Sequence, residues 1–368
     1  MKKETRLPFE LEVRMRHYSV PGIGIAVFHQ GQMEYREGYG VMEAETEQKV
    51  SADSLFHACS ISKMITAIGI LRLVQEGVLD LDEDVNRYLV SWRIPDNPYT
   101  ELKKVTLRSL LAHQAGFVDP KGSFDVYQKQ DSFPTPKELL SGQTRYISQP
   151  IQVTCVPESQ FSYSDAGYSV VEQLIEDVTG ESFATVMERL VMAPLGLSRT
   201  FFWDGSIQYG AGETDFKARE GAVAGHNKLG RIVEGKRAHY PNLSGAGLWS
   251  TPTELAILTN EVIKAWNGDT TSILQPDIAR MMLTGYGCNK TVGLGVFLPK
   301  ADDGEPYLVS KGWGVGFQCM LAAYPRLQSG IVVMTNSEPG KPQEEALVGE
   351  VIQAYCTQYK WPGFLDNA

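Results

Sequence analysis

Cysteine is scarce in this chain, and its spacing is irregular. No C-x-x-C pair occurs among the five cysteines, which are Cys59, Cys155, Cys288, Cys319 and Cys356. Such a set predicts neither a disulfide framework nor a zinc site. The six histidines are dispersed and no H-E-x-x-H motif is present, so we expect no metal and no cofactor.

Long apolar runs are also missing. In the first half of the chain the longest run, residues 64–71, ends at Arg72, whereas a membrane-spanning helix needs about 20 apolar residues. The N-terminus begins with basic residues, but Glu10 and Glu12 interrupt it before the apolar core of a signal peptide can form. We therefore expect no membrane span and a location in the cytoplasm. Removal of a leader would leave the same pattern.

Positive charge is outnumbered. The chain of 368 residues has 34 Lys and Arg against 44 Asp and Glu, which gives a net charge of −10. A surface of that sign repels phosphate backbones and anionic lipids, so we expect no binding of nucleic acid. The hydrophobic fraction of 43% is ordinary for a globular protein with a core of useful size.

The apolar patterns predict an α/β fold. A hairpin is expected over residues 24–35 around Gln30-Gly31-Gln32. Helix patterns occupy residues 60–76, 106–113, 168–179 and 344–359, and strand patterns occupy residues 293–297, 320–324 and 330–334. Strands near both ends predict one antiparallel sheet, built from both termini and flanked by helices, with a mostly helical insertion. We expect a sheet domain from residues 1–80 and 245–368, a helical domain from 81–244, and a cleft between them.

Ser60-Ile61-Ser62-Lys63 is the first candidate for chemistry. Residues three apart on a helix share a face, so Lys63 can reach the Ser60 hydroxyl. Serine becomes a nucleophile beside a base, and desolvation of a buried lysine lowers its pKa toward that role. About one Ser-x-x-Lys arises by chance in a chain of this length. This one opens the helix that we expect to be buried, where an unpaired lysine is costly.

Two later segments carry residues suited to the same site. Tyr163-Ser164-Asp165 offers a tyrosine, whose pKa falls beside a lysine ammonium and which can then act as a general base. An aromatic ring packed under a loop is the alternative. The segment 310–317, S-K-G-W-G-V-G-F, is rich in glycine, as in strands that a ligand approaches closely. A bulged strand without a ligand is the alternative there.

In this order, the three segments resemble the Ser-x-x-Lys, Tyr-x-Asn and Lys/His-x-Gly motifs of the class C β-lactamase and serine penicillin-binding protein family. That family includes DD-peptidases, D-amino-acid amidases, esterases and transacylases. Further similar segments are residues 20–22, 110–117, 194–197, 245–251 and 334–337. The resemblance covers nearly the whole chain and implies a β-lactamase-like fold.

The resemblance also implies a role for each residue. Ser60 would attack a carbonyl and form an acyl-enzyme, while Lys63 and Tyr163 share the proton transfers. The backbone N–H groups of Ser60 and Trp313 would form the oxyanion hole, with Gly312 beside it on the strand. Water or another acceptor would then release the acyl group.

The tyrosine motif departs from the family pattern at Asp165, where lactamases and DD-peptidases have asparagine. Asparagine can donate a hydrogen bond to the amide carbonyl of an acyl group, whereas an ionised aspartate only accepts. Asp165 also opposes a lowered pKa of Tyr163, or holds Lys63 in its charged form. This change disfavours β-lactams and peptidoglycan stems, and it suits esters or a substrate that presents an amine.

The third motif departs from the pattern in its register. Ser310 stands in the position of the usual cation, and Lys311 follows one residue later. Neighbouring side chains of a strand point to opposite faces. Either Ser310 faces the cleft, which we favour, or a bulge brings Lys311 into it. Without the cation the site has less grip on a substrate carboxylate.

We therefore expect a cofactor-free serine hydrolase that acts through Ser60 on small esters or amides, with weak β-lactamase activity as a further possibility. Two alternatives stay open. One is a transacylase of the same fold, and the other is a non-catalytic penicillin-binding or scaffold protein. No G-x-S-x-G motif occurs, which argues against an α/β-hydrolase. The acyl group, the leaving group and the oligomeric state are not predicted.

Overall fold

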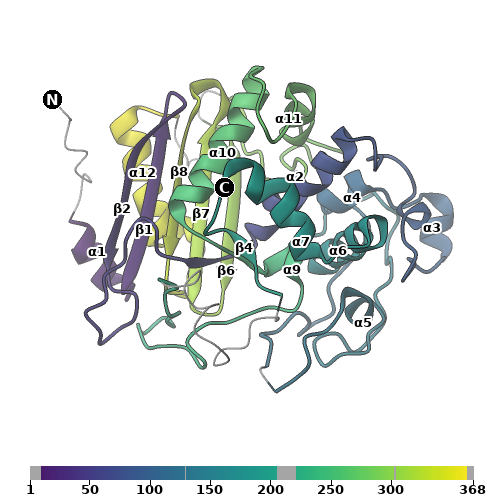
Figure 1. Ribbon diagram of the computed structural model, residues 1–368, viewed down its shortest axis with the longest axis horizontal. Coiled ribbons are helices and arrows are strands. Elements are labelled where there is room, and N and C mark those ends of the chain that lie inside the picture. The colour runs from purple at the N-terminus through teal and green to yellow at the C-terminus, as the bar shows by residue number, and fades with distance from the viewer. Residues whose placement is uncertain (1–9, 129, 205–220, 302–303, 363–368) are drawn as a thin grey trace.

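A five-stranded antiparallel sheet joins the two ends of the chain (Figure 1). The computed structural model describes residues 10–128, 130–204, 221–301 and 304–362. The sheet has the strand order β2-β1-β8-β7-β6. Its strands are β1 (Gly22–His29), β2 (Gln32–Gly40), β6 (Leu308–Gly314), β7 (Phe317–Tyr324) and β8 (Ser329–Thr335). Strand β1 pairs with β8, so the sheet is antiparallel and built from both terminal regions, as the sequence predicts.

Both faces of this sheet are buried at β1, β7 and β8, whereas the edge strand β2 is largely exposed. In β1, the side chains of Ile23, Ile25 and Val27 belong to one apolar cluster, and those of Ala26 and Phe28 belong to the other. Successive side chains of a strand point to opposite faces, so a strand covered on both sides is apolar at every position. The two clusters are therefore the two sides of one sheet.

Helices cover the two faces from opposite sides (Figure 1). Helix α10 (Pro252–Asn267) packs on the face that also meets α2 (Ser62–Gln75). On the other face lie α1 (Leu11–His17) and α12 (Leu347–Tyr359). The face under α10 and α2 is thus continuous with the helical part of the molecule, and β3 and β6 meet there.

A second, smaller sheet has the order β3-β5-β4. Its strands are β3 (Phe56–Cys59), β4 (Phe201–Phe202) and β5 (Leu248–Ser250). The other α-helices in the described part of the chain are α3 (Pro98–Leu102), α4 (Leu107–Leu111), α5 (Pro136–Leu140), α6 (Asp165–Thr179), α7 (Phe183–Met187), α9 (Leu243–Ala246) and α11 (Pro276–Met282). Short helical turns of other types are η1 (Val85–Arg87), η2 (Glu188–Met192), η3 (Ala193–Leu195), η5 (Pro325–Leu327) and η6 (Gln343–Glu345). The division into domains at residues 80 and 244 stays a prediction.

Local signals explain where the long helix α6 begins and ends. Ser164 caps its N-terminus, since the side-chain oxygen accepts the N–H of Gly167. Gly180 ends the helix in the left-handed conformation with φ of 69°, which glycine adopts without a Cβ clash. The Ser164 cap makes Asp165 the first residue of α6, and the Gly180 cap makes Thr179 the last.

The strand expected over residues 293–297 is wrong. Val292 and Phe297 form an isolated bridge with each other, and the residues between them turn. Gly295 has φ of +76°, and a Cβ built on it would lie 2.5 Å from the Cβ of Ala67 on α2. The apolar run therefore belongs to a glycine turn that packs closely on α2.

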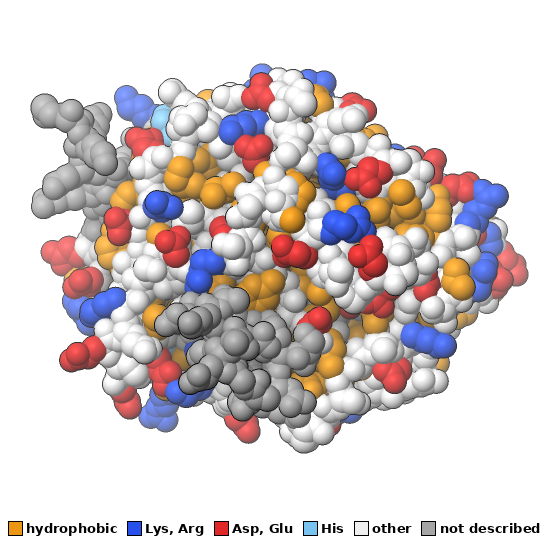
Figure 2. All heavy atoms as spheres, viewed as in Figure 1, with side chains coloured by type: hydrophobic (Ala, Val, Ile, Leu, Met, Phe, Trp, Pro, Cys, Tyr) orange, Lys and Arg blue, Asp and Glu red, His pale blue; other side chains and the backbone are white. Residues whose placement is uncertain are grey.

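Acidic and basic side chains are interspersed over the face shown in Figure 2. That mixture matches a chain whose excess of acidic residues is modest for its size. Among the described helices, none is both long enough and apolar enough to cross a membrane.

Candidate active site

Ser60 lies in the turn between β3 and α2. Cys59, just before it, has a positive φ of 48°, which turns the chain sharply from strand to helix. Ser62 fixes this turn, because its hydroxyl donates to the carbonyl of Cys59 and accepts the N–H of Leu248 at 3.0 Å. Within the described residues the backbone N–H of Ser60 has no hydrogen-bond acceptor. That free donor is available to an incoming ligand.

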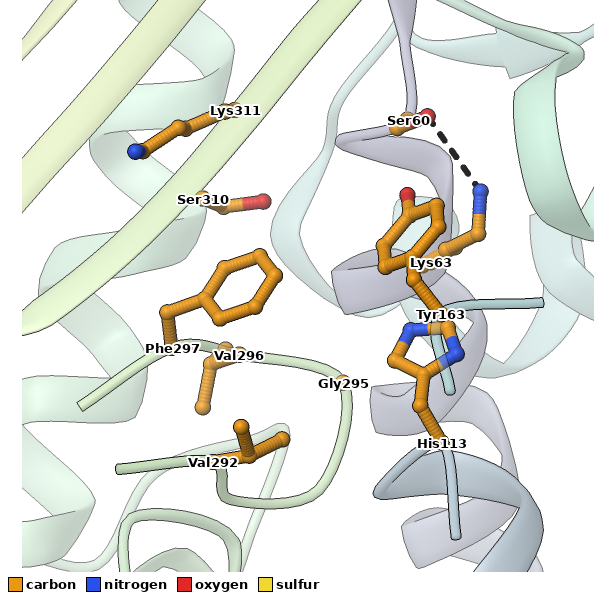
Figure 3. Close-up of a pocket in the computed structure, with 10 residues that line it drawn as sticks. All are labelled: Ser60, Lys63, His113, Tyr163, Val292, Gly295, Val296, Phe297, Ser310 and Lys311. Carbon is orange, nitrogen blue, oxygen red and sulfur yellow. Dashed lines mark hydrogen bonds between the residues drawn. The ribbon is translucent and has the colours of Figure 1, made fainter. Parts of the chain in front are cut away.

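Lys63 points from the first turn of α2 toward Ser60 (Figure 3). Its side chain is only 3% exposed. Its Nζ donates to Ser60 Oγ at 3.2 Å, to Asp165 Oδ1 at 2.7 Å and to the Gly245 carbonyl at 2.9 Å. These three bonds use all the donors of an ammonium group, so the environment is built for the charged form.

The pKa of Lys63 follows from these partners. Burial alone would lower the pKa, but the charges of Asp165 and Tyr163 outweigh it, and the pKa rises above its usual value. Desolvation does lower the pKa, but it is outweighed, so the net direction agrees with the alternative in which Asp165, 2.7 Å away, holds Lys63 in its charged form. At neutral pH Lys63 is an ammonium.

Tyr163 places its hydroxyl toward Ser60 (Figure 3). Its ring lies 4.8 Å from Lys63 Nζ and stacks on His113 with ring centroids 4.3 Å apart. Burial raises the pKa of Tyr163, Lys63 lowers it and Asp165 raises it again, and the net result is a raised pKa. Lys63 lowers the pKa and Asp165 opposes it, as expected, but burial decides the net direction, and Tyr163 is a neutral phenol in the resting site.

Two residues that the sequence analysis did not select position Tyr163 and Asp165. His113 is buried and accepts the N–H of Ser164 on Nδ1 at 3.1 Å. Its pKa is lowered by burial and by Lys63, so it is neutral. The carboxylate of Asp119 accepts from the Ser164 hydroxyl and from the N–H of Asp165 and of Ala166. His113 lies in the family-like segment 110–117, but that segment assigns it no role, and Asp119 has no motif. Both roles depend on where the loops before α6 lie.

Strand β6 forms the opposite wall. The Ser310 hydroxyl points into the pocket, and the Lys311 side chain points away on the other face (Figure 3). The register is regular, with Ser310 opposite Leu321 and Lys311 opposite Met320, so no bulge turns Lys311 inward. Lys311 pairs with Glu344 instead. The pocket is lined by Ser60, Lys63, His113, Tyr163, Val292, Gly295, Val296, Phe297, Ser310 and Lys311.

Gly312 and Trp313 continue this wall beside the nucleophile turn. A Cβ on Gly312 would lie 2.3 Å from the carbonyl oxygen of Ala58, so only glycine lets β6 come this close to the Ser60 turn. Trp313 is 42% exposed, and its indole N–H donates to Glu338 at 3.3 Å. Two residues after Lys311 on a regular strand, the ring lies on the same face of β6 as the Lys311 side chain.

The carbonyl that holds Lys63 is itself positioned by a buried acid. Glu172 on α6 accepts the N–H of Ser244 at 2.9 Å, one residue before Gly245. Next to it, Asn242 donates to Asp165 Oδ1 at 3.1 Å. The segment 242–246 thus ties α6 to Lys63. No motif identifies Glu172, since it reads as one acid among several on a helix.

Glu172 predicts a pH-dependent stability. Burial raises its pKa to about 8, above the unfolded value of about 4.3. The folded state holds this proton more tightly than the unfolded state does. Protonated Glu172 therefore contributes fully to the free energy of unfolding below about pH 4.3, and this contribution is lost as the pH rises through 8. Between pH 5 and 8.5 we expect the free energy of unfolding of the wild type to fall by on the order of 1–4 kcal/mol relative to that of Glu172→Gln. Urea unfolding of both proteins across this range measures it, and parallel curves would contradict it.

A metal centre is not formed by the residues that the structure describes, since no three His, Cys, Asp or Glu side chains gather with ligand geometry there. The polar groups of the site instead bond to one another. Their arrangement provides a hydroxyl, a neighbouring ammonium and a phenol around one pocket.

Known proteins with similar sequences were found by comparison. The chain is 24% identical to Protein flp of Staphylococcus aureus strain COL over 247 residues. This aligned region covers 67% of this chain and 45% of that protein. Over 170 residues it is 27% identical to penicillin-binding protein 4* of Bacillus subtilis, 46% of this chain and 35% of that one. The chain spans less than half the length of these two relatives.

A solved structure with a similar fold is the D-amino acid amidase of Ochrobactrum anthropi SV3, complexed with D-phenylalanine. The TM-score is 0.74 with 20% identity, and the match covers 95% of this chain and 98% of that one. At this identity the likeness shows a shared β-lactamase-like fold. Residues 10–354 match the family model described as Beta-lactamase. Since this match covers most of the chain, the protein belongs to the beta-lactamase family.

Proposed function

We propose that the protein is a serine hydrolase that acts on small esters or amides through an acyl-enzyme on Ser60. The observation that carries this proposal is the bond from the buried Lys63 ammonium to Ser60 Oγ. Such a bond stabilises negative charge as it develops on the nucleophile. The free N–H of Ser60 and that of Trp313 would bind the oxyanion.

The protonation states suggest how the proton moves. Because Lys63 is charged and Tyr163 is neutral at rest, the reactive form is the minor one in which Tyr163 has lost its proton. Ser60 Oγ then bonds to the carbonyl carbon and gives its proton to the Tyr163 oxygen. When the bond to the leaving group breaks, Tyr163 passes that proton on. A water molecule repeats the sequence to free the acid.

The pocket wall supports esters or amides that lack a carboxylate rather than substrates held by one. Ser310 stands where the family pattern has a cation, and Lys311 is paired to Glu344 on the other face. A carboxylate on the substrate would therefore find no free cation on this wall. The D-amino acid amidase of similar fold makes amides a class worth testing next to esters.

Hydrolysis of p-nitrophenyl acetate tests the proposal. We expect a burst of p-nitrophenol equal to the enzyme present, then steady turnover, with an acetyl group on the peptide that contains Ser60 by mass spectrometry. Faster product release with an added alcohol or amine would favour the transacylase. Persistent acetylation without turnover would favour a binding protein, and no acetylation of folded protein would contradict the proposal.

Neighbouring residues of β6 provide a matched pair of variants. Ser310→Ala removes a hydroxyl that points into the pocket, so we expect kcat/KM for p-nitrophenyl acetate to fall about 10- to 100-fold. Lys311→Ala removes a side chain on the other face, so we expect less than a threefold change. It also removes the partly buried pair with Glu344, which should lower stability rather than activity. Equal, negligible effects on kcat/KM would show that neither side chain meets the substrate.

A further inference from the structure

Asp165 has one engaged oxygen and one free oxygen. Oδ1 accepts from Lys63 Nζ at 2.7 Å and from Asn242 Nδ2 at 3.1 Å. Oδ2 has no hydrogen-bond donor among the residues that the structure describes. The side chain is 25% exposed, so this oxygen can meet a ligand. A carboxylate oxygen offers only acceptor positions, and it suits a donor that is charged.

The free oxygen lies in a region with more negative than positive charge. Lys63 is the cation next to Asp165, and its three donors are occupied. The carboxylate of Asp119 lies behind the backbone of Asp165 and accepts its N–H at 2.7 Å. Lys311 does not balance these acids, because it points to the other face and pairs with Glu344. An added cation would therefore be favoured here and an added anion disfavoured.

The short spacing between Ser60 and Asp165 means that such a cation would belong to the acyl group of the substrate. Asp165 and Ser60 both accept hydrogen bonds from the same Lys63 nitrogen. Their side-chain oxygens are therefore separated only by that nitrogen. A carbonyl carbon under attack lies about 3–3.5 Å from the serine oxygen. An amine on the neighbouring carbon is only about two bonds of 1.5 Å further. A donor at that position can reach Asp165 while the carbonyl stays at Ser60.

We propose that Asp165 selects acyl groups that carry a protonated amine next to the carbonyl. Its Oδ2 accepts a hydrogen bond from this ammonium and fixes the acyl group against Ser60. This inference rests on the proposed function, because it names the substrate class of the same site. An asparagine in this position would present an uncharged amide, which gains far less from a cation.

Competition with p-nitrophenyl acetate tests the selection. Each enantiomer of alaninamide is compared with propanamide, which has the same carbon chain without the amine, at constant ionic strength and pH 7. We expect the preferred enantiomer of alaninamide to halve ester hydrolysis at a concentration at least tenfold below that of propanamide. Equal potency, or no inhibition by either enantiomer, would overturn the inference.

Two further arms identify the group responsible. Asp165→Asn should remove most of the tenfold preference, whereas Glu338→Gln, the same loss of charge on the partner of Trp313, should leave the ratio within twofold. In wild type the preference should fall as pH rises above about 8, where an α-amine loses its proton. Lys63, Tyr163 and Asp119 lie around Asp165 and also act on the ammonium, which propanamide lacks. Lys63 and Tyr163 both have raised pKa values, so they keep their protons near pH 8, and the α-amine is the group that loses its proton there.

The proposed function and the inference fail in different ways. If wild type shows no hydrolysis of p-nitrophenyl acetate that depends on Ser60, the proposed function fails. If the ester is hydrolysed but the preference is missing, or survives both Asp165→Asn and the change of pH, only the inference fails. The pH arm uses the unaltered protein, so poor folding of a variant cannot hide the result.

Discussion

Ser60→Ala is expected to reduce kcat/KM for p-nitrophenyl acetate by at least about 10³-fold and to abolish the burst of p-nitrophenol. The alanine keeps the turn and the free backbone N–H of residue 60, but it removes the atom that forms the acyl bond. Lys63 then keeps its bonds to Asp165 and Gly245, so the pocket should persist. Stopped-flow absorbance and intact mass measure both effects.

Ser62→Ala is the matched control, because it removes the other hydroxyl of the same motif. Ser62 donates to the Cys59 carbonyl and accepts the N–H of Leu248, so its loss should cost about 1–3 kcal/mol of stability. The burst should remain, and kcat/KM should fall less than tenfold. A burst that survives in Ser60→Ala, or vanishes equally in both variants, would contradict the assignment of Ser60 as nucleophile.

The fold could be predicted in outline because its apolar patterns are strong. The hairpin over residues 24–35 and the buried helix over residues 60–76 correspond to β1, β2 and α2. The run over residues 293–297 was misassigned, since a continuous apolar segment with two glycines satisfies both a strand and a tight turn. What decides it is the close contact of Gly295 with Ala67, and a long-range contact of this kind leaves no periodic signal.

The candidate site could be predicted at the level of residues, whereas the protonation of Lys63 and Tyr163 stayed open between two alternatives. Helical spacing predicts Lys63 next to Ser60, and this holds although Ser60 lies in the turn just before α2. Alternation along a strand is enough to favour Ser310 over Lys311. The pKa directions depend on partners that lie far apart in the chain, such as Asp165, which is 102 residues from Lys63. Charge in a buried site is set by such three-dimensional pairs, which a local motif does not specify.

Lys63→Met is expected to lower kcat/KM by about 10²- to 10⁴-fold and to move the pH dependence toward higher pH. In wild type the rate should rise with pH without a plateau below 10, because the pKa of Tyr163 is raised above that value. Lys63 lowers this pKa, so its removal makes the phenolate rarer at any given pH. Profiles of kcat/KM from pH 6 to 10, corrected for hydroxide hydrolysis, test the shift.

Two comparisons separate this role from loss of structure. Lys311→Met removes a lysine of the same pocket whose side chain points to the other face, and it should change neither the rate nor the profile by more than threefold. The double variant with Ser60→Ala should be no slower than Ser60→Ala alone, since both residues act in one step. A loss below tenfold in Lys63→Met, with the profile unchanged, would remove Lys63 from the mechanism. Its three bonds would then serve only to hold α2, α6 and the segment 242–246 together.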